Sequence, residues 1–411
     1  MKNLIEIYAI ALFSKLMFTL CQIRINTTEV GGFLYSYFSF GYPSQNFYER
    51  INQKLNFTYV SPSVFKKNVS KTLQLKNTEK LYVGQALADA ELVIDSINTT
   101  VFNVSTFNFY FIQKASRLFL TGNELGMGYN IINENFSLIH LLKNSNNISR
   151  LEYAIVPGNN QFSGSLYLGG MPVNESIKYN FRTTCKVNKT YEAWGCTLNS
   201  VFYGDISFIS KSVEFTNQYI NYFQASEPYI LAPDEFMRFL EKNVFEKYYG
   251  LGKCGYMEGI NDYFECSKDI INELSNSFVF AFGDSVITIK RDDLFRCFEH
   301  KCKFLIMNNR IGDQWVLGMQ FMRFFAMNFD YENSEISFYS NNKNIHIIDV
   351  KEAFIFKGFA EKFLIFVIIG LAFSLIKIYK SYEINKKIVE RKEAIGIDEN
   401  DNEKVLNFYK V

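Results

Sequence analysis

The chain has 411 residues, 48% of them hydrophobic, so it can bury a sizeable core and is too apolar to be disordered over most of its length. Its 43 Lys and Arg residues balance 42 Asp and Glu residues, which leaves no basic field for nucleic acid and no acidic field for a basic partner. With 42 Phe, 26 Tyr and only 6 Pro residues, the composition favours β-sheets.

Residues 1–22 are typical of a secretory signal peptide. Lys2 precedes the apolar run Ile7–Phe13, and a second apolar run, Leu16–Cys21, follows. Lys15 interrupts the two runs, so a signal anchor or a buried N-terminal segment is the alternative interpretation.

Nine Asn-x-Ser/Thr sequons also favour passage through the secretory pathway, because this tripeptide is the acceptor for N-glycosylation. They are Asn26, Asn56, Asn68, Asn98, Asn103, Asn135, Asn147, Asn174 and Asn188. All nine precede residue 190. Some would arise by chance in an Asn-rich chain, so their occupancy by N-glycans is a prediction that a mass shift after glycosidase treatment tests.

Between about residue 29 and residue 345, short apolar segments alternate with Gly, Asn and Ser turns, which predicts a large, mainly β region. One helix is expected over Pro233–Glu246, where proline opens the helix, acids occupy its first turn and apolar residues share one face. The clearest strands are expected at Gly32–Phe40, Ala90–Ile94, Ser165–Leu168, Phe278–Phe282 and Glu335–Tyr339.

Six cysteines follow the predicted signal peptide, and an even number in an oxidising compartment favours three disulfides. A short loop makes Cys185 with Cys196 the preferred pair. Cysteine and histidine are zinc ligands, and the sequence places Cys297, His300 and Cys302 close together. A disulfide loop with an incidental histidine is the preferred interpretation. We expect no metal or cofactor. The six cysteines are Cys185, Cys196, Cys254, Cys266, Cys297 and Cys302.

Near the C-terminus, the uncharged run Phe363–Ile376 predicts one transmembrane helix over residues 363–379. The run spans about 21 Å of a hydrocarbon core of about 30 Å, and the flanking Lys362 and Lys377 can reach the interface and close much of the gap. A buried core helix is the alternative. The Lys-rich start of the tail, residues 380–411, favours a cytoplasmic C-terminus and a single-pass type I topology, with the globular part extracellular or in the lumen of the secretory or endolysosomal system.

Four motifs in the globular region resemble, in their order, those of the pepsin-like aspartic proteases. Two of the motifs each contain a Leu-Gly turn, at Leu125-Gly126 and at Leu317-Gly318. The two turns are about 190 residues apart. The four motifs are FGYPSQNF at residues 40–47, ELGMGY at 124–129, GSLYLGG at 164–170, and WVLG with FMR and FDYEN between 315 and 333.

The resemblance implies a bilobal, mainly β fold in which two lobes of double-psi type enclose a cleft. The N-terminal lobe is expected at residues 23–175 and the C-terminal lobe at residues 176–345. A juxtamembrane linker at residues 346–362 would then lead into the transmembrane helix.

The family's chemistry requires two aspartates, one from each lobe, that share a proton and activate a water molecule. In the family each stands in Asp-Thr/Ser-Gly, and this sequence contains no such tripeptide. Counting from Gln45 puts Asn52 at the first aspartate, and counting back from Pro233 puts Gln224 at the second. Because an amide does not accept a proton as a carboxylate does, the resemblance implies a catalytically inactive relative.

Other parts of the expected site also depart from the family. Counting from Gly84 and Asp89 puts Asn77 where the family has the tyrosine that covers its substrate, and we expect Tyr82, as a strand residue, to pack on the sheet. Glu227 lies three positions after Gln224 on a tight loop, so we expect its carboxylate to point away from the lost position.

The preferred hypothesis is a non-catalytic, membrane-anchored protein whose interlobe cleft binds peptide or protein through strand-like hydrogen bonds. An active membrane-bound aspartic endopeptidase with a different motif register, and an unrelated adhesive or structural surface glycoprotein, are the alternatives. A serine or cysteine hydrolase is poorly supported, because none of His140, His300 and His346 lies near an evident nucleophile elbow.

Overall fold

The structure is a computed structural model that divides into two compact units, residues 1–349 and 350–411. Within its described residues, no helix is long and apolar enough to cross a membrane. The predicted signal peptide lies outside the described residues except for Gln22, as does the predicted span at 363–379 except for Lys377 and Tyr379. The described residues are 22–83, 86–115, 122–129, 134–158, 163–189, 193–204, 213–274, 277–282, 285–310, 312–340, 347–349, 377, 379–383 and 386–387.

A 13-stranded sheet is built mainly from the first half of the chain, in the order β11-β24-β23-β9-β10-β1-β2-β3-β8-β4-β7-β6-β5. Side chains alternate in exposure along β1, as expected of a strand with one face on the core. The strands are β1 Ile23–Val30, β2 Phe33–Phe40, β3 Gln45–Asn52, β4 Tyr59–Val60, β5 Gln74–Val83, β6 Ala86–Asn98, β7 Asn103–Ala115, β8 Glu124–Gly126, β9 Glu152–Pro157, β10 Ser163–Leu168, β11 Phe181–Lys186, β23 Ala326–Asp330 and β24 Glu335–Ser340. Three short helices accompany them: η1 Glu134–Phe136, α2 Leu138–Asn144 and α3 Val173–Ser176.

The second half forms an eight-stranded sheet in the order β21-β14-β22-β13-β12-β17-β18-β25 and a four-stranded sheet in the order β15-β16-β20-β19. Their strands are β12 Gly195–Tyr203, β13 Val213–Phe223, β14 Ile230–Ala232, β15 Cys254–Met257, β16 Tyr263–Ser267, β17 Ser277–Phe282, β18 Ser285–Lys290, β19 Phe295–Phe298, β20 Lys301–Phe304, β21 Ile306–Asn308, β22 Trp315–Leu317 and β25 Ile347–Asp349. The helical segments are α4 Asp234–Leu240, a π-helical turn η3 Glu241–Phe245, α5 Glu246–Tyr249, η4 Lys268–Glu273, η5 Arg291–Leu294 and α6 Met319–Met322.

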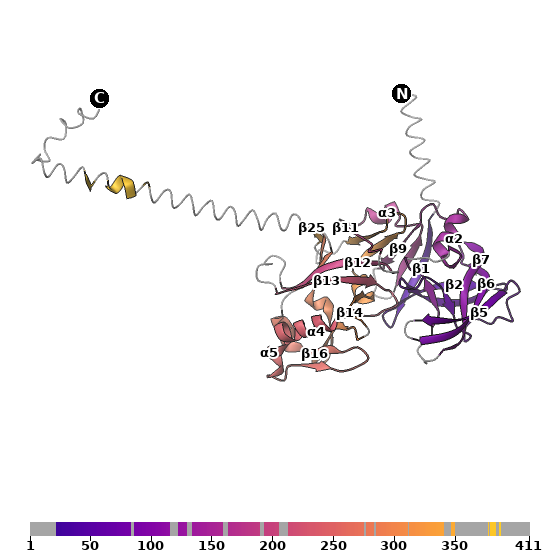
Figure 1. Ribbon diagram of the computed structural model, residues 1–411, viewed down its shortest axis with the longest axis horizontal. Helices are drawn as coiled ribbons and strands as arrows, with labels where there is room; N and C mark the ends of the chain where they lie inside the picture. Colours follow the sequence, from indigo (N-terminus) through magenta and orange to yellow (C-terminus); the bar gives the residue numbers. More distant parts are fainter. Residues whose placement is uncertain are drawn as a thin grey trace, which may run out of the picture. The chain divides into compact units, whose positions relative to one another are not determined.

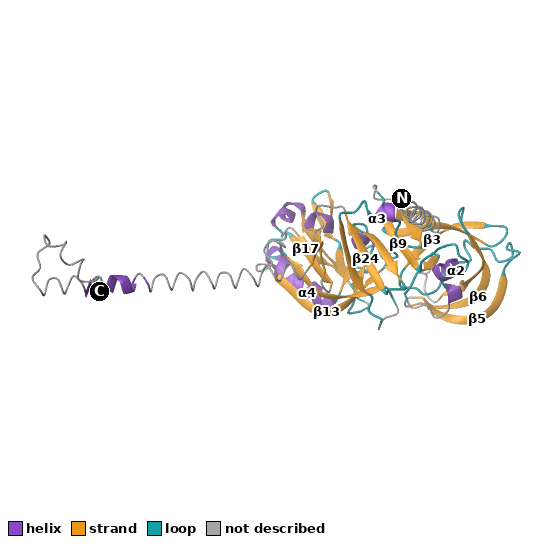
Figure 2. Ribbon diagram, turned by 90° about the horizontal axis from the view of Figure 1, so that it is seen from above, coloured by secondary structure: helices purple, strands orange, loops and turns teal. Residues whose placement is uncertain are grey.

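The two halves are joined by strand pairing rather than by a flexible linker. Strand β23, from the end of the globular region, pairs antiparallel with β9, which extends the first sheet into β24 and β11. Figure 1 shows the indigo and purple elements of the first half beside the pink and orange elements of the second, and Figure 2 shows β9 and β24 in the same region of strands.

An aromatic cluster packs beneath this junction. The Trp194 and Tyr331 rings lie 4.7 Å apart, and the Tyr153 and Phe329 rings lie 4.6 Å apart and are stacked. Trp194 donates a hydrogen bond to the backbone oxygen of Met127 (2.8 Å) and thereby ties the second half to the loop that follows β8. Large buried aromatics of this kind contribute much of a core's stability.

The mainly β prediction is confirmed, and each strand expected from the sequence lies within an observed strand or overlaps one closely. The predicted helix at Pro233–Glu246 is also found, as α4, η3 and α5 in succession after Pro233. Its apolar face is buried through Phe236, Leu240 and Val244.

The six cysteines form three disulfides, as predicted: Cys185–Cys196, Cys254–Cys266 and Cys297–Cys302. The last pair joins the adjacent strands β19 and β20, so these two cysteines are not zinc ligands. Across the described residues, no cluster of three or more His, Cys, Asp or Glu side chains could hold a metal ion.

The nine sequon asparagines all lie in the described residues, and none is buried. Asn26, Asn68, Asn103, Asn135 and Asn174 are exposed, and the other four are partly exposed. Their side chains are therefore accessible in the folded chain, and glycosylation stays a prediction.

The expected position of the flap tyrosine is wrong. The β5–β6 hairpin turns between Val83 and Ala86, whereas Asn77 lies well down β5, opposite Leu92. Tyr82 stands beside the turn and is 72% exposed, so it does not pack on the sheet as expected. The count took Gly84 and Asp89 for the end of this hairpin, whereas Asp89 pairs with Lys80 on β5, only three pairs from the turn.

Candidate functional site

Two loops occupy equivalent places in the two lobes. In the first lobe, β3 runs parallel to β8 and pairs Asn52 with Gly126. In the second, β13 runs parallel to β22 and pairs Phe223 with Leu317, so that the next residue, Gln224, lies level with Gly318. Because Gly126 and Gly318 belong to the two Leu-Gly turns, this pairing makes Asn52 and Gln224 counterparts.

The two loops meet directly across the lobes. The backbone N–H of Ala225 donates a hydrogen bond to Oε1 of Gln53 (2.6 Å), which joins the residues that follow Gln224 and Asn52. Leu34 on β2 donates a second interlobe bond to the Ala225 carbonyl (3.2 Å). Gln53 is fully buried, and within the described part of the chain its Nε2 has no hydrogen-bond partner.

Asn52 is held within its own lobe on both sides of its amide. Nδ2 donates to Oε2 of Glu124 (2.6 Å), and Oδ1 accepts from the backbone N–H groups of Lys54 (2.9 Å) and Leu55 (3.3 Å). Glu124 also forms an ion pair with Arg50. Burial lowers the pKa of Arg50, but Glu124 and Tyr59 outweigh burial and the net direction is upward, which keeps the guanidinium charged.

Gln224 is likewise turned to a neighbour in its own lobe. Its Nε2 donates to Oγ of Ser226 (2.8 Å), and its backbone N–H donates to the Leu317 carbonyl (3.2 Å). The amides of Asn52 and Gln224 are therefore each engaged locally. Neither amide can serve as a general base at neutral pH, because neither accepts a proton there.

The sequence and the fold match known aspartic proteases. The family described as eukaryotic aspartyl protease matches residues 45–340. The chain belongs to this family. An aspartic proteinase from Irpex lacteus has a similar structure, with a TM-score of 0.63 and 11% identity over 78% of this chain and 97% of that one, which shows the fold alone. No curated protein matches the sequence in a direct comparison.

Membership in the aspartyl protease family rules out the alternative that the four motifs are coincidental. In this chain the loops that follow Asn52 and Gln224 contact each other, and both residues carry amides. That they stand at the positions of the family's two aspartates stays a prediction.

Glu227 is a carboxyl group on the second of these loops. It is partly exposed, and burial raises its pKa to about 7, against opposing effects from the backbone N–H of Tyr229 and the charge of Arg50. The Tyr229 N–H lies 3.4 Å from Glu227 Oε1. Arg50 of the first lobe thus has an electrostatic effect on Glu227. The direction of the Glu227 carboxylate relative to the position of Gln224 stays a prediction.

A row of buried polar side chains crosses three strands beside this site. Thr27 on β1 lies opposite Ser36 on β2, which lies opposite Glu49 on β3. All three are at most 2% exposed, and their side-chain oxygens have no hydrogen-bond partner among the residues that the structure describes. Burial, reinforced by the charge of Glu124, raises the pKa of Glu49 well above its usual range and so favours the neutral form of this carboxyl.

Three residues that shape the site were missed at the sequence level: Arg50, Gln53 and Glu124. Glu124 was quoted only as part of the ELGMGY motif, although it stands where the family has an apolar residue. The charge of Glu124 at a motif position that is apolar in the family was the available signal. A buried charge requires a partner, so this charge could have indicated a cation such as Arg50 nearby. Gln53 carried no comparable signal, since its interlobe bond depends on how the lobes meet.

Proposed function

We propose that the chain is a non-catalytic member of the aspartyl protease family whose interlobe cleft binds an extended peptide or protein segment. The observation that carries the proposal is the state of the two counterpart side chains, Asn52 and Gln224, whose amides are hydrogen-bonded within their own lobes. Proteolysis by this family needs two carboxyl groups that share a proton, and amides at both positions leave the water without a base.

Peptide binding does not depend on those carboxyl groups. A chain bound in extended form is held chiefly by backbone hydrogen bonds, with pockets for alternate side chains. The interlobe bonds from Ala225 and Leu34 keep the two loops in contact without an aspartate pair, which favours retention of the cleft's floor.

The proposal also includes the cellular setting. Nine accessible sequons, three disulfides and the apolar run Phe363–Ile376 favour a single-pass type I membrane glycoprotein that faces an oxidising compartment. Membrane attachment through residues 363–379 would hold the cleft on the extracellular or lumenal side.

A residual endopeptidase is the second candidate, and Glu227 is the observation that favours it. A carboxyl with a pKa of about 7 is suited to exchange protons near neutrality. The absence of a second available carboxyl group argues against this candidate. The carboxyl group beside Asn52 is that of Glu124, which already forms an ion pair with Arg50 and accepts a hydrogen bond from Asn52.

One experiment separates the two candidates. The full chain is incubated with a pool of fluorescent decapeptides at acid and neutral pH, and cleavage and anisotropy are recorded together. We expect saturable binding that a transition-state mimic of the family displaces, without cleavage. Cleavage that the mimic blocks and that Glu227→Gln abolishes would establish the endopeptidase instead, and absence of any binding would contradict the peptide-binding role.

The double variant Asn52→Asp, Gln224→Asp is the matched control. It restores the family's acids at both positions, and detectable cleavage by this variant would show that the cleft admits the same peptides. Its binding in the anisotropy assay should resemble that of the wild type.

A further inference from the structure

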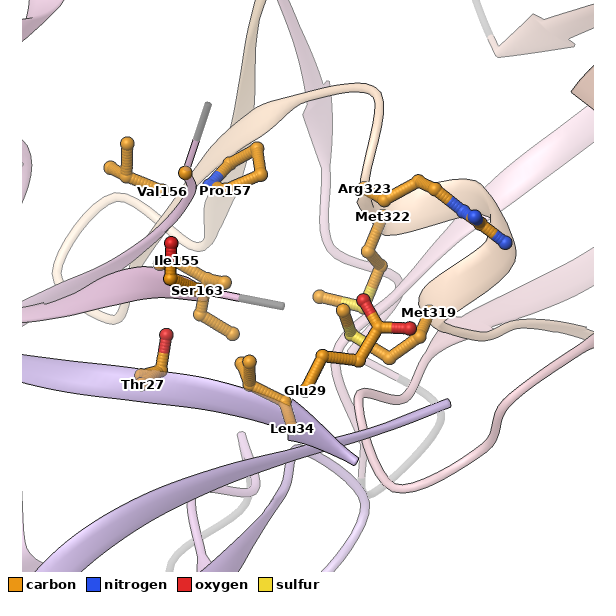
Figure 3. Close-up of a pocket in the computed structure, with 12 residues that line it drawn as sticks. Thr27, Glu29, Leu34, Ile155, Val156, Pro157, Ser163, Met319, Met322 and Arg323 are labelled. Atoms are coloured by element: carbon orange, nitrogen blue, oxygen red, sulfur yellow. The ribbon is translucent and has the colours of Figure 1, made fainter. Parts of the chain in front are cut away.

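A cavity of about 130 Å³ lies between β1, the ends of the β9–β10 hairpin and helix α6. Figure 3 shows Thr27 on one side of the cavity and Glu29 with Met319 and Met322 on the other. The rest of its wall is largely apolar, and its two charged lining residues, Glu29 and Arg323, have opposite charges. These groups select no particular class of ligand. The cysteines of the four-stranded sheet, in contrast, have a defined chemistry.

Four cysteines form a single row across the four-stranded sheet. Cys254 on β15 lies opposite Cys266 on β16. Cys266 also lies opposite Cys302 on β20, which in turn lies opposite Cys297 on β19. Residues that are opposite each other in an antiparallel pair share a face of the sheet, so all four side chains lie on one face. The disulfides Cys254–Cys266 and Cys297–Cys302 use the two outer pairings, so that each bond lies within one hairpin.

The central pairing, between Cys266 and Cys302, also suits a disulfide. Directly opposite residues of an antiparallel pair have Cα atoms about 4.5–5.5 Å apart, and a disulfide spans about 4.4–6.8 Å between its Cα atoms. The pairing of β16 with β20 continues regularly past this point, where the Lys268 N–H donates to the His300 carbonyl (2.9 Å). Each central cysteine can therefore bond to either of its two neighbours in the row without a change of register.

Exposure differs along the row. Cys266 and Cys302 are at most 1% exposed and belong to the hydrophobic core. Cys254 is partly exposed, and Cys297 is exposed. A reagent in solution can therefore reach the Cys297 end of the row, whereas the two central cysteines are shielded from solvent and lie next to each other.

We propose that the row is a thiol–disulfide exchange site that takes up a small thiol, such as glutathione, at Cys297. The thiolate attacks Sγ of Cys297, a mixed disulfide forms there, and Cys302 departs as a thiolate. Cys302 then attacks Sγ of Cys266, the Cys266–Cys302 bond forms, and Cys254 departs as a thiolate. Cys254 finally takes up the proton that the attacking thiol released. The number of disulfides is unchanged, and one thiol enters at Cys297 for each thiol released at Cys254.

Solvation favours the second of these steps. It moves a negative charge from Cys302, which is fully buried, to Cys254, which is partly exposed, and a buried charge is costly. The step also changes what the disulfides hold together. The two bonds within hairpins β15–β16 and β19–β20 are replaced by one bond between them, from β16 to β20, and the outer strands β15 and β19 lose their covalent link to the sheet.

The test is a reaction of the full folded chain with reduced glutathione. Remaining thiols are blocked with N-ethylmaleimide, and the chain is digested with trypsin and chymotrypsin, which cut between the cysteines of each hairpin. Mass spectrometry without reduction then identifies the linked peptides. We expect three products to appear together: glutathione on Cys297, N-ethylmaleimide on Cys254, and a peptide pair linked through Cys266 and Cys302.

A single substitution tests the exchange without an added thiol. Cys297→Ser leaves Cys302 without its partner from the start, so we expect the Cys266–Cys302 bond to form and the free thiol to be found on Cys254. Fixed pairings would leave the free thiol on Cys302 instead. The mirror variant Cys254→Ser should place the free thiol on Cys297.

Cys185→Ser is the matched control, because it frees Cys196, which lies outside the row, and should leave the row's pairings unchanged. Unfolding midpoints check that each variant is folded, and the glutathione reaction of the wild-type chain decides the matter if one is not. No uptake of glutathione by the row, or uptake that leaves the free thiol on Cys302, would overturn the proposal. A Cys266–Cys302 bond in the untreated chain would overturn it as well, because the pairing would then not depend on a thiol.

Discussion

At the scale of single residues, the candidate site consists of the amides of Asn52 and Gln224, each hydrogen-bonded within its own lobe, and of the largely buried carboxyl group of Glu227. Asn52 and Gln224 could be located from the sequence because short motifs fix the count from Gln45 and Pro233. Their hydrogen-bond partners could not be located in the same way. Glu124 reaches Asn52 from a strand more than 70 residues away, and no local pattern encodes that contact.

Glu227 makes stability depend on pH. Its pKa is near 4.5 in the unfolded chain and about 7 in the folded one. Between these values the unfolded chain has released the proton that the folded chain keeps, so the unfolded state gains stability as pH rises. We expect the unfolding free energy of the wild type, relative to Glu227→Gln, to fall by up to about 3 kcal/mol from pH 4.5 to pH 7 and then to level off.

Denaturant unfolding of both proteins across this pH range measures the difference. Subtracting the Glu227→Gln curve removes contributions from groups that titrate in both proteins. A difference that is flat with pH would mean that Glu227 is as solvated in the folded chain as in the unfolded one.

Glu49 is expected to destabilise the fold. Its carboxyl is fully buried without a hydrogen-bond partner, opposite Ser36, whose hydroxyl is also unpaired. Replacing it by leucine removes the cost of burying an unpaired polar group, so we predict that Glu49→Leu raises the unfolding free energy by about 1–3 kcal/mol. Denaturant unfolding checks this, with Glu49→Gln as a control that keeps a polar group and should gain less. A large loss of stability in Glu49→Leu would indicate that water or another group satisfies this carboxyl.

At the scale of elements, the two Leu-Gly turns serve the same purpose in each lobe. A Cβ at Gly126 would lie 2.2 Å from the carbonyl oxygen of Phe57, and one at Gly318 would lie 2.2 Å from that of Tyr229. Each glycine thus lets the loop that follows Asn52 or Gln224 pack closely against it. The recurrence of the two turns is visible in the sequence, and the structure identifies the backbone that approaches each glycine.

Gly126→Ala tests this packing. The methyl group would meet backbone atoms that cannot move as a flexible side chain can, so we predict a loss of roughly 1–3 kcal/mol in unfolding free energy. Gly255→Ala is the matched control, because no atom lies within 4 Å of a Cβ at that position, and its effect should stay below about 1 kcal/mol. Equal effects of the two substitutions in denaturant unfolding would contradict the role assigned to Gly126.

Elements were predicted with unequal success for a physical reason. The strands and the helix after Pro233 have apolar periodicities that are visible within a few residues. Hairpin register depends on where the turn falls, and a slip by an even number of residues preserves the inward and outward alternation. For that reason the β5–β6 turn was misplaced, and with it the expected environment of Tyr82.

At the scale of the whole molecule, residues 1–349 form one compact unit. The similar Leu-Gly turns in its two halves do not make those halves separate units. The family resemblance predicted two lobes around a cleft, but nothing in the local sequence indicated that β23 and β24 would complete a sheet begun by β9, β10 and β1. Pairing between residues that lie about 170 positions apart is decided by the collective packing of both halves. The cavity beside α6 was unforeseen for the same reason, because its walls come from both ends of the unit.

The pairing of β9 with β23 has a consequence for the order in which the protein is made. Strand β9 leaves the ribosome well before residues 326–330, and until they emerge one of its edges lacks its native neighbour. Unpaired strand edges in incomplete chains invite association with other chains. Sugar chains on the nine early sequons, if attached as the polypeptide enters the lumen, would surround that half with bulky solvated groups during this interval, and the concentration of all nine before residue 190 suits such protection.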